Sequence, residues 1–307
     1  MRNWLTQQFK KTADSLSDDK LTGLTLRAIG DRASGKTTYV AALARWPNAD
    51  PASTVEAVTA SSEEGVSLIA QAQNILEQGL TLKPTRLDAY ADVTDLKDYR
   101  LRVVLKQQFS LQIPQLAKGS SFVMDLDCKD YPGEFFSELL HQADNPLLQS
   151  YLEDCLEANG ILFCVDGISY RKDTDYARGL SKFLTALESS DKVSKRRMAM
   201  VLTKCEQPDL WINRHKPREL TIARFPEVYQ QLETWHKLGK GRVEYFTTSA
   251  FGVLGTHAPE PNSKQIRRDR EGVVSIIKEP KHWRPFGLVA PIYWLYTGKH
   301  HKDLEKG

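Results

Sequence analysis

The sequence lacks any long apolar run. No stretch approaches the roughly 20 continuous apolar residues that a membrane-spanning helix needs, and residues 1–16 contain no apolar secretory core. We therefore expect a cytoplasmic protein. A charge bias is missing too, because 42 Lys and Arg stand against 39 Asp and Glu, for a net charge of +3. The net charge gives no reason to expect nucleic acid or an anionic membrane as a partner.

Cysteine and histidine are scarce. The four cysteines, Cys128, Cys155, Cys164 and Cys205, form no close pairs, which argues against a disulfide framework and against a zinc ribbon. Cys128 and Cys164 lie in or beside apolar runs, so we expect them to be buried, reduced thiols. The seven histidines show no metal-ligand spacing, and we predict no protein-bound zinc.

What the sequence does contain is an alternation of short apolar runs and helical patterns. We expect strands at residues 24–29, 99–105, 122–128, 160–165, 198–202 and 243–247, and helices at 37–45, 63–78, 135–151, 175–187 and 225–238. Residues 48–62 are small and polar and are expected to form a loop. The link between 99–105 and 122–128 has no helical pattern, which favours an antiparallel pair. The pattern predicts an α/β three-layer sandwich with a mostly parallel sheet and one antiparallel strand.

Three regions are expected along the 307 residues. Residues 1–20 form an amphipathic helix that docks on the main domain, and contact with a membrane or a partner is the alternative that we do not favour. The main domain covers residues 21–256. Residues 257–307 comprise a basic segment, flexible over 259–270, and a closing helix at 285–296. We expect the basic side chains to form a solvated face, with a phosphate-rich partner as the alternative.

The strongest motif, here called the phosphate loop, covers residues 30–37 and fits the pattern G-x-x-x-x-G-K-[ST]. It consists of Gly30, Asp31, Arg32, Ala33, Ser34, Gly35, Lys36 and Thr37, with Thr38 next to it. Its glycines let successive backbone N–H groups face one anion, and the following helix adds its positive N-terminal end. Lys36 can reach the β- and γ-phosphates, and the Thr37 hydroxyl can bind Mg²⁺. The pattern predicts a P-loop NTPase fold and a nucleotide site.

A second motif, the switch motif, follows the strand expected at 122–128. Its residues are Asp130, Tyr131, Pro132, Gly133 and Glu134. A carboxylate there can hold Mg²⁺ opposite Thr37, and the Gly133 N–H can contact the γ-phosphate, although the same letters also make an ordinary turn. Asp125 and Asp127 are rival carboxylates. Asp130 is preferred because we expect it to lie beyond the end of the strand.

Two further motifs follow later strands. The base motif is Thr203, Lys204, Cys205 and Glu206, and the closing motif is Thr248, Ser249 and Ala250. A lysine stem can pack on a flat purine, and a carboxylate can accept from the two donors on the edge of guanine that adenine lacks. A small residue at Ala250 lets a backbone N–H approach the base. The alternative for the base motif is a solvated charged turn.

The order of these four motifs, across about residues 24–251, resembles Ras-like GTPases of the translation-factor class. More narrowly, G-x-x-x-S-G-K-T-T-Y, D-Y-P-G-E and the late segment 283–295 are similar to bacterial GTPase-like proteins of the double-GTPase kind. The resemblance implies phosphate and Mg²⁺ roles for Lys36 and Thr37, and a second switch at Asp130 and Gly133. It further implies that Thr203, Lys204 and Glu206 contact the base and that Ser249 and Ala250 close over it.

The sequence departs from the family pattern at three places. Glu206 replaces the base-reading Asp and is one methylene longer, which bears on guanine preference. Glu134 stands where many relatives have Gln, so it would act as a base toward water or repel the γ-phosphate. No motif fixes the threonine of the first switch; Thr85 is our candidate, with Thr54 and Thr59 as rivals.

Arg32 adds a feature of its own, because it lies inside the phosphate loop. Its guanidinium can supply the charge that a partner's arginine finger usually delivers, or it can point to solvent. Together the motifs predict a GTP- and Mg²⁺-binding switch that hydrolyses GTP slowly, with Lys36, Glu134 and Arg32 as catalytic residues, and acts on a partner protein. The alternatives are an ATPase of the same fold and a nucleotide-binding scaffold without useful turnover.

Overall fold

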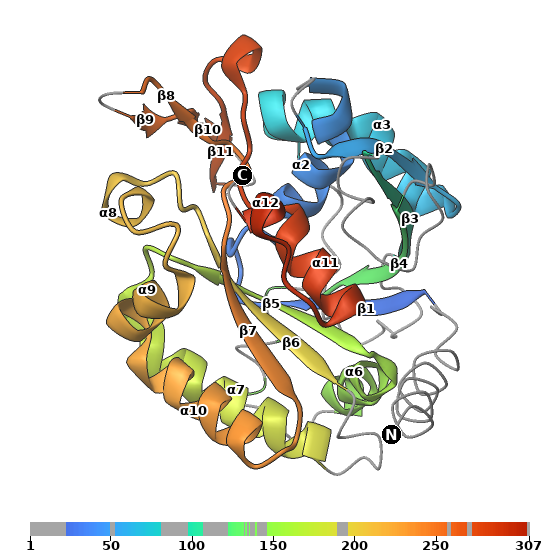
Figure 1. The fold of residues 1–307 in the computed structure, drawn as a ribbon, viewed down its shortest axis with the longest axis vertical. Coiled ribbons are helices and arrows are strands. Elements are labelled where there is room, and N and C mark those ends of the chain that lie inside the picture. The colour runs from blue at the N-terminus through green and yellow to red at the C-terminus, as the bar shows by residue number, and fades with distance from the viewer. Residues whose placement is uncertain are drawn as a thin grey trace, which may run out of the picture.

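The computed structural model describes residues 23–49, 53–80, 98–106, 122–131, 133, 135, 139, 146–188, 196–256, 259–268 and 272–305. Within these residues a seven-stranded sheet runs through the molecule in the order β2-β3-β4-β1-β5-β6-β7 (Figure 1). Its strands are β1 Leu24–Ile29, β2 Val55–Ala60, β3 Asp98–Leu105, β4 Phe122–Asp130, β5 Gly160–Asp166, β6 Arg197–Thr203 and β7 Arg242–Thr247.

The sheet is parallel apart from one strand. β1 pairs in parallel with β4 and β5, and the pairs β5–β6 and β6–β7 are parallel as well. β3 pairs antiparallel with both of its neighbours, β2 and β4. The prediction of a mostly parallel sheet with one antiparallel strand is therefore confirmed, and so is the antiparallel pairing of the strands predicted at 99–105 and 122–128.

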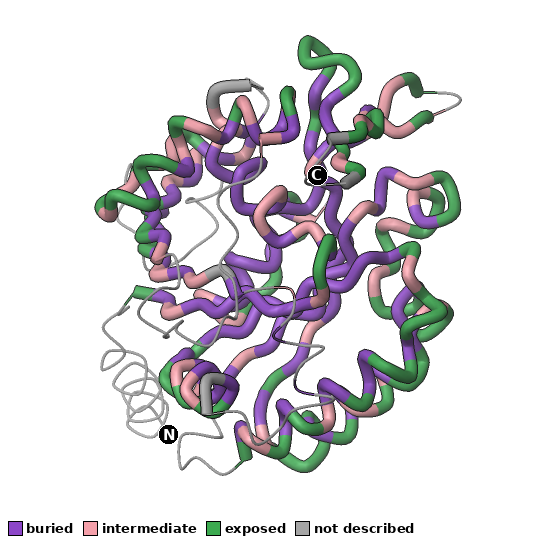
Figure 2. The backbone as a smooth tube through the Cα atoms, turned by 180° about the vertical axis from the view of Figure 1, so that it is seen from behind, coloured by how far each residue is buried: buried purple, intermediate pink, exposed green. Residues whose placement is uncertain are grey.

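Helices cover both faces of the sheet (Figure 1). On one face lie α2 (Lys36–Ala49), α3 (Glu63–Gln78) and α11 (Val289–Thr297), and on the other lie α6 (Pro146–Glu157), α7 (Asp173–Glu188) and α10 (Pro226–Lys237). Alternate residues of β1 feed the two apolar clusters, because Leu26 and Ala28 join the first and Ile29 joins the second. Figure 2 shows the buried backbone running through the centre. This confirms the three-layer sandwich.

The expected loop at 48–62 is a wrong prediction, because residues 55–60 form the edge strand β2. Its residues, V-E-A-V-T-A, carry little apolar area, and only Val55 is fully buried. Pairing with β3 supplies the hydrogen bonds that make this segment a strand. By contrast, β5 is buried at every residue, so its continuous apolar run was easy to recognise from the sequence.

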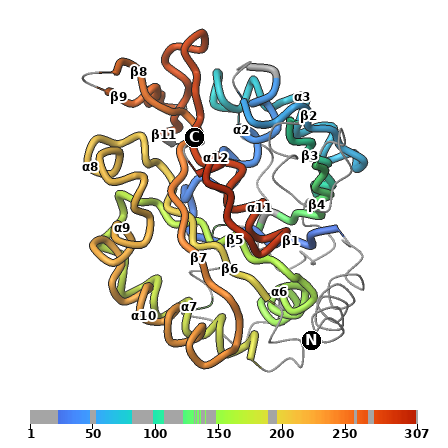
Figure 3. Tube along the Cα trace, viewed as in Figure 1, coloured from blue at the N-terminus to red at the C-terminus, as the bar shows by residue number. Residues whose placement is uncertain are grey.

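The C-terminal region is more structured than we predicted. Part of the expected flexible segment forms β10 (Ser263–Arg268), which pairs antiparallel with β11 (Gly272–Ile277). The hairpin packs on the end of α3, where Gly79 adjoins the side chains of Val274 and Ile276. The closing helix is α11, which begins at Val289 rather than 285. Figure 3 traces this region, in orange and red, back across the sheet.

The remaining elements are short. They are η2 Tyr170–Lys172, α8 Pro208–Trp211, α9 Pro217–Arg224, β8 Val253–Leu254, β9 Glu260–Pro261, η4 Pro280–His282 and α12 Lys302–Glu305. The predicted helix at 1–20 lies outside the described residues. Of the helix predicted at 135–151, Phe135 and Leu139 are helical, and α6 begins at Pro146. All four cysteines are buried thiols outside any disulfide, as predicted for Cys128 and Cys164. Across the described residues, no helix has the length and apolar character to cross a bilayer.

Candidate functional site

Four motif-bearing strands end at one edge of the sheet. β1 leads into the phosphate loop, β4 into the switch motif, β6 into the base motif and β7 into the closing motif. Because these strands are parallel, their carboxyl ends share that edge. This edge is where ligands bind in open α/β sheets. The structure therefore brings together four segments that are up to about two hundred residues apart in the chain.

The phosphate loop has the backbone geometry that its glycines predict. Gly30 has φ +147°, and a Cβ there would lie 2.1 Å from the carbonyl oxygen of Cys164. Gly35 has φ +88°, and Ala33, with φ +61°, adopts the left-handed conformation that a residue with a Cβ rarely takes. The chain then enters α2 at Lys36 without an intervening residue. The first amides of a 14-residue helix thus follow the curled loop, as anion binding requires.

Lys36 is buried, with 7% of its surface exposed. Its Nζ donates to the carbonyl oxygens of Gly30 at 2.9 Å and Asp31 at 3.1 Å. The ammonium is thus folded over its own loop and held there by two of the loop's carbonyl oxygens. Thr37 and Thr38 follow in the first turn of α2.

Asp31 ties the phosphate loop to the segment that follows β5. Its Oδ2 accepts from Lys172 Nζ at 2.6 Å and from the Tyr176 hydroxyl at 3.2 Å, while its Oδ1 accepts from the backbone N–H of Arg32 at 2.7 Å. Burial and the nearby Asp31 raise the pKa of Tyr176 well above its usual value. Lys172 therefore balances the charge of a carboxylate that lies inside the phosphate loop. Sequence reasoning missed Lys172 and Tyr176, which no motif marks.

Thr203, in the base motif, also braces the phosphate loop. Its hydroxyl lies 2.7 Å from the Ser34 carbonyl oxygen, to which it donates, and 3.2 Å from that of Val165. It is buried, and Gly35 sits against it, since a Cβ on Gly35 would lie 3.6 Å from its side chain. The base motif and the phosphate loop are thus joined directly through one side chain.

Lys204 is fixed by a carboxylate at the end of β5. Its Nζ donates to Asp166 Oδ2 at 2.7 Å, while Asp166 Oδ1 accepts from the Ile168 N–H at 3.1 Å. Lys204 also has φ +60°, an unusual conformation for a side-chain-bearing residue. The ion pair and the backbone together set the direction of the lysine stem. Asp166 could have been found in the sequence as the polar residue that ends an apolar run.

Glu206 is buried, with 3% exposure, more deeply than Asp166, which is 9% exposed at the same edge. Burial raises the pKa of its carboxyl, against the opposing effect of hydrogen bonds from Ser249 and its own backbone and of the charge on Lys204. Its Oε2 has no hydrogen-bond partner among the described residues. A buried carboxylate with a spare acceptor is costly unless a donor reaches it. The Glu206 carboxylate is thus held beside Ser249 of the closing motif.

The closing motif is fixed from the C-terminal side. Ser249 and Phe286 exchange both backbone hydrogen bonds, each 2.9 Å long, and Trp283 Nε1 donates to the Ala250 carbonyl oxygen at 2.8 Å. The Ser249 hydroxyl accepts from the Gly252 N–H at 2.7 Å. Sequence reasoning found Ser249 and Ala250 but missed Trp283 and Phe286, which lie more than thirty residues away.

Within the switch motif, Gly133 lies directly against the phosphate loop. A Cβ on Gly133 would come within 2.4 Å of Arg32 Cα and 2.6 Å of Arg32 N. Arg32 itself is exposed. β4 extends to Asp130, so this residue ends the strand instead of lying beyond it, and it is aligned with Ala28 of β1. Glu134 lies outside the described residues.

Tyr131 anchors the start of the switch motif on α6. Its buried hydroxyl donates to Asp154 Oδ2 at 2.5 Å. Asp154 also accepts from Arg27 at 2.7 and 3.0 Å and from Lys129 at 2.8 Å. Burial raises the pKa of Asp154, but the hydrogen bonds from Arg27, Lys129 and Tyr131 outweigh it, so that the pKa is lowered. The switch motif therefore begins at a charge network that holds α6 to the sheet.

The rival Mg²⁺ carboxylates lie on the other face of β4 from α2. Leu126 and Cys128 belong to the cluster beneath α2, so the alternate residues Asp125 and Asp127 face away from it. Asp125 instead pairs with Arg102 at 2.6 Å. Asp130 is the last residue of β4, the strand next to β1, which leads into the phosphate loop; hydroxyl and carboxylate oxygens are the kinds of ligand that Mg²⁺ prefers, and Thr37 with Asp130 stays a prediction for that ion.

The rival threonines for the first switch lie far from the phosphate loop. Thr54 precedes Val55, which pairs with Leu105, and Leu105 pairs with the first residue of β4. Thr54 is therefore at the opposite edge of the sheet. Thr59 lies in β2, three strands from β1, or roughly 14 Å at the usual strand spacing.

Thr85, our candidate, lies outside the described residues. The segment that contains it leads into β3, whose first residue, Asp98, is aligned with Lys129 near the carboxyl end of β4. The chain therefore enters β3 at the same edge as the phosphate loop. This keeps Thr85 as a prediction.

No protein-family model matches this chain, and no curated protein matches it. Among solved structures, it is similar to a chain of the signal recognition particle receptor SRb-GTP/SRX complex from Chaetomium thermophilum, with a TM-score of 0.40 and 15% identity over 76% of this chain and 93% of that one. It is also similar to the G domain of the FeoB iron transporter of T. maritima, with a TM-score of 0.30 and 14% identity over 75% and 89% of the two chains. Similarity this low does not indicate a function for this chain. The proposed function therefore rests on the geometry of the site.

Proposed function

We propose that this protein binds GTP with Mg²⁺ and hydrolyses the β–γ bond slowly, as a molecular switch that acts on a partner protein. The observation that carries the proposal is the bond from the Thr203 hydroxyl to the Ser34 carbonyl. It joins a phosphate-binding loop to a base-reading segment, so the two halves of a nucleotide site are held in one rigid unit.

The phosphate half supplies positive charge and directed amides. The loop and the start of α2 provide backbone N–H groups, and Lys36 provides an ammonium that can exchange its carbonyl partners for phosphate oxygens. The Thr37 hydroxyl and the Asp130 carboxylate would hold Mg²⁺, which neutralises charge on the β- and γ-phosphates when bound.

The base half favours guanine. The spare Oε2 of Glu206 is an acceptor that needs a donor, and guanine offers two donors on one edge where adenine does not offer that pair. The ion pair with Asp166 orients the Lys204 stem, on which a purine can stack. ATP preference would overturn the guanine assignment while leaving the phosphate half intact.

Hydrolysis depends on groups around Gly133. Its close approach to Arg32 of the phosphate loop supports this role, in which the Gly133 N–H would donate to the γ-phosphate. The Arg32 guanidinium is free to supply charge in the transition state, and Glu134 to orient or deprotonate the attacking water. Loss of the γ-phosphate would release the segments around Thr85 and Asp130, and the partner would read this change.

Nucleotide titration tests binding. We expect Mg²⁺-dependent affinity for GTP, a clear preference over ATP in competition, and loss of affinity in Lys36→Ala. Absence of Mg²⁺-dependent affinity for any purine triphosphate would refute the proposed function.

Single-turnover phosphate release tests hydrolysis. Arg32→Ala should slow turnover more than it weakens GTP binding, because the guanidinium acts on the transition state. Equal losses would remove Arg32 from the chemistry. Release by the unaltered protein no faster than by Lys36→Ala would instead indicate a nucleotide-bound scaffold.

A further inference from the structure

We propose that residues 283–288, here called the strap, position the closing motif for reading the base, and that Trp283 is the positioning residue of this strap. The inference rests on the proposed function and extends it to a segment that no nucleotide motif contains. Its basis is a set of contacts that converge on residues 247–252 from one short stretch of chain.

The strap and the closing motif form a small antiparallel bridge. The Ser249 N–H donates to the Phe286 carbonyl, and the Phe286 N–H donates to the Ser249 carbonyl, both at 2.9 Å. Ser249 is fully buried, and Phe286 is 4% exposed. The backbone of Ser249 is therefore set by the strap, and its hydroxyl remains available to the neighbouring Glu206 carboxylate.

Trp283 holds the peptide group between Ala250 and Phe251. Its indole is 2% exposed, and Nε1 donates to the Ala250 carbonyl at 2.8 Å. A peptide whose carbonyl is held in one direction has less freedom to rotate, so the backbone around Ala250 keeps one orientation. The Ala250 N–H belongs to the preceding peptide, whose Ser249 carbonyl accepts from the Phe286 N–H. The strap therefore holds both peptides that flank the Ala250 Cα, and the proposed contact of the Ala250 N–H with the base depends on their joint orientation.

Two glycines permit the close approach of the two segments. A Cβ on Gly252, which has φ +71°, would lie 1.8 Å from the Arg284 carbonyl oxygen. A Cβ on Gly287, which has φ +67°, would lie 2.2 Å from the Thr247 carbonyl oxygen. The chains are packed backbone to backbone at both ends of the bridge, so neither can shift alone.

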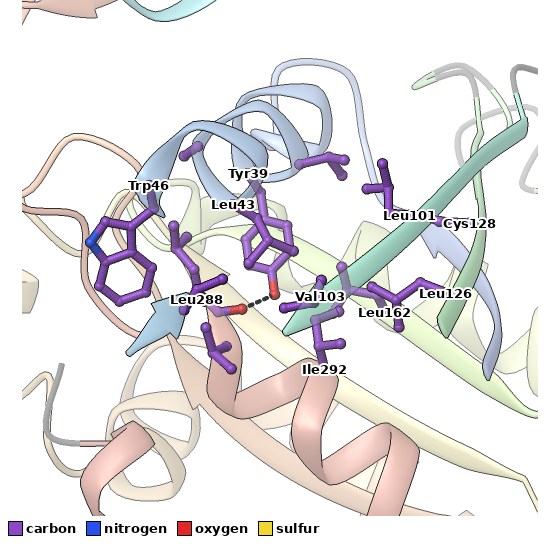
Figure 4. Close-up of a cluster of buried hydrophobic side chains, with 14 of the residues drawn as sticks. Tyr39, Leu43, Trp46, Leu101, Val103, Leu126, Cys128, Leu162, Leu288 and Ile292 are labelled. Carbon is purple, nitrogen blue, oxygen red and sulfur yellow. Dashed lines mark hydrogen bonds between the residues drawn. The ribbon is translucent and has the colours of Figure 1, made fainter. Parts of the chain in front are cut away.

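The strap also contacts the helix that follows the phosphate loop. The Tyr39 hydroxyl of α2 donates to the Leu288 carbonyl (Figure 4). Tyr39 is three residues beyond Lys36 and is buried. One six-residue segment thus touches the closing motif at one end and the phosphate-binding helix at the other. The strap thereby fixes the spacing between the base half and the phosphate half of the site.

Trp283→Phe tests the role of the indole N–H, and Trp235→Phe is its matched control. Trp235 is also buried, at 3% exposure, but its Nε1 finds no hydrogen-bond partner among the described residues. Both variants lose the same atoms, but only the first loses a bond to the site. The probes are Mg²⁺-GTP and Mg²⁺-tripolyphosphate, which occupies the phosphate half alone.

We expect Trp283→Phe to weaken GTP binding by about fivefold to tenfold, the worth of one hydrogen bond. Tripolyphosphate binding should be unchanged, as should both affinities in Trp235→Phe. Unchanged GTP affinity, or equal losses for both probes, would overturn the inference while leaving the proposed function standing. Wild-type protein that binds GTP no better than tripolyphosphate would overturn the proposed function and the strap's role with it.

Gly252→Ala and Gly239→Ala provide a second, independent pair. Their backbone angles match, at φ +71° and +70°, but nothing lies within 4 Å of a Cβ on Gly239. Both variants incur the same backbone strain, whereas only Gly252→Ala pushes the strap away. We expect selective loss of GTP affinity in Gly252→Ala, and equal behaviour of the two variants would contradict the strap's role.

Discussion

Replacing Thr203 by valine removes the hydroxyl that braces the phosphate loop and keeps the side-chain shape. The Ser34 carbonyl then loses the donor that lies 2.7 Å away in a buried position. An unsatisfied buried acceptor costs about 1–3 kcal/mol. If the loop keeps its conformation without nucleotide, this cost lowers the stability of the free protein. If the loop relaxes, the same cost appears as weaker binding, since binding must restore the conformation.

The lower stability of the free protein and the weaker binding add up to the same total however the cost is divided between them. This total is the loss of stability of the nucleotide-bound protein, so the bound protein is the one to measure. We expect the free energy of unfolding of GTP-saturated Thr203→Val, from urea titration, to be about 1–3 kcal/mol below that of wild type. Thr203→Ser keeps the hydroxyl and should retain most of the wild-type free energy of unfolding. Thr185→Val is the control, because its exposed hydroxyl bonds only to the Ser181 carbonyl of its own helix. A value for Thr203→Val within about 0.5 kcal/mol of wild type would refute the brace.

Three further outcomes follow from the site. Gly133→Ala should slow single-turnover GTP hydrolysis by about tenfold or more with a smaller loss of affinity, because its Cβ would meet Arg32; equal losses would argue against a role in the chemistry. Burial raises the pKa of the Glu206 carboxyl, so the folded state binds more protons than the unfolded state. Stability therefore falls as the pH rises from the usual pKa of a glutamate through the raised pKa of the folded state. Glu206→Gln should therefore gain stability over wild type at pH 8 and none at acid pH in urea titrations, while losing preference for GTP. Asp154→Asn should lose about 3 kcal/mol in urea titrations at neutral pH, because it removes the nearest carboxylate from the buried Arg27, which keeps only the longer contact with Asp127, and from the partly buried Lys129; the exposed Asp125→Asn should lose less than about 1 kcal/mol. Because the pKa of Asp154 is lowered, the loss should shrink as pH falls through that pKa.

Local signals in the sequence were enough to predict the helices and strands whose own residues mark where they begin and end. α3 was predicted to the residue from its helical spacing, and in the structure local signals set both of its ends: Ser62 accepts the Gly65 N–H at 3.1 Å, and Gly79 ends the helix at φ +65°. β5 was recognisable because both faces of the strand are buried and its run is wholly apolar. β2 was missed because its stability comes from pairing with β3, and pairing leaves no local mark on a short run of Ala, Thr and Val.

The candidate site shows the same division. Lys36, Thr203 and Ser249 were found because each directly follows a strand end or a glycine loop, and parallel strands bring such ends together. The contacts that hold these residues were out of reach. The Tyr176–Asp31 bond spans 145 positions, and the Trp283–Ala250 bond spans 33. No spacing rule connects residues whose proximity is decided only by how the chain returns over the sheet.

This division has a consequence for how the site works. Under the proposed function, a variant can keep every motif residue and still lose nucleotide affinity, because the strap residues Trp283 and Phe286 hold the backbone around Ala250 and Lys172 balances the charge on Asp31. The first of these supports lies on the base side and the second on the phosphate side. Base selectivity and phosphate affinity should therefore be separable by changing residues that touch no nucleotide. The common element is the Thr203 brace, whose loss should affect both.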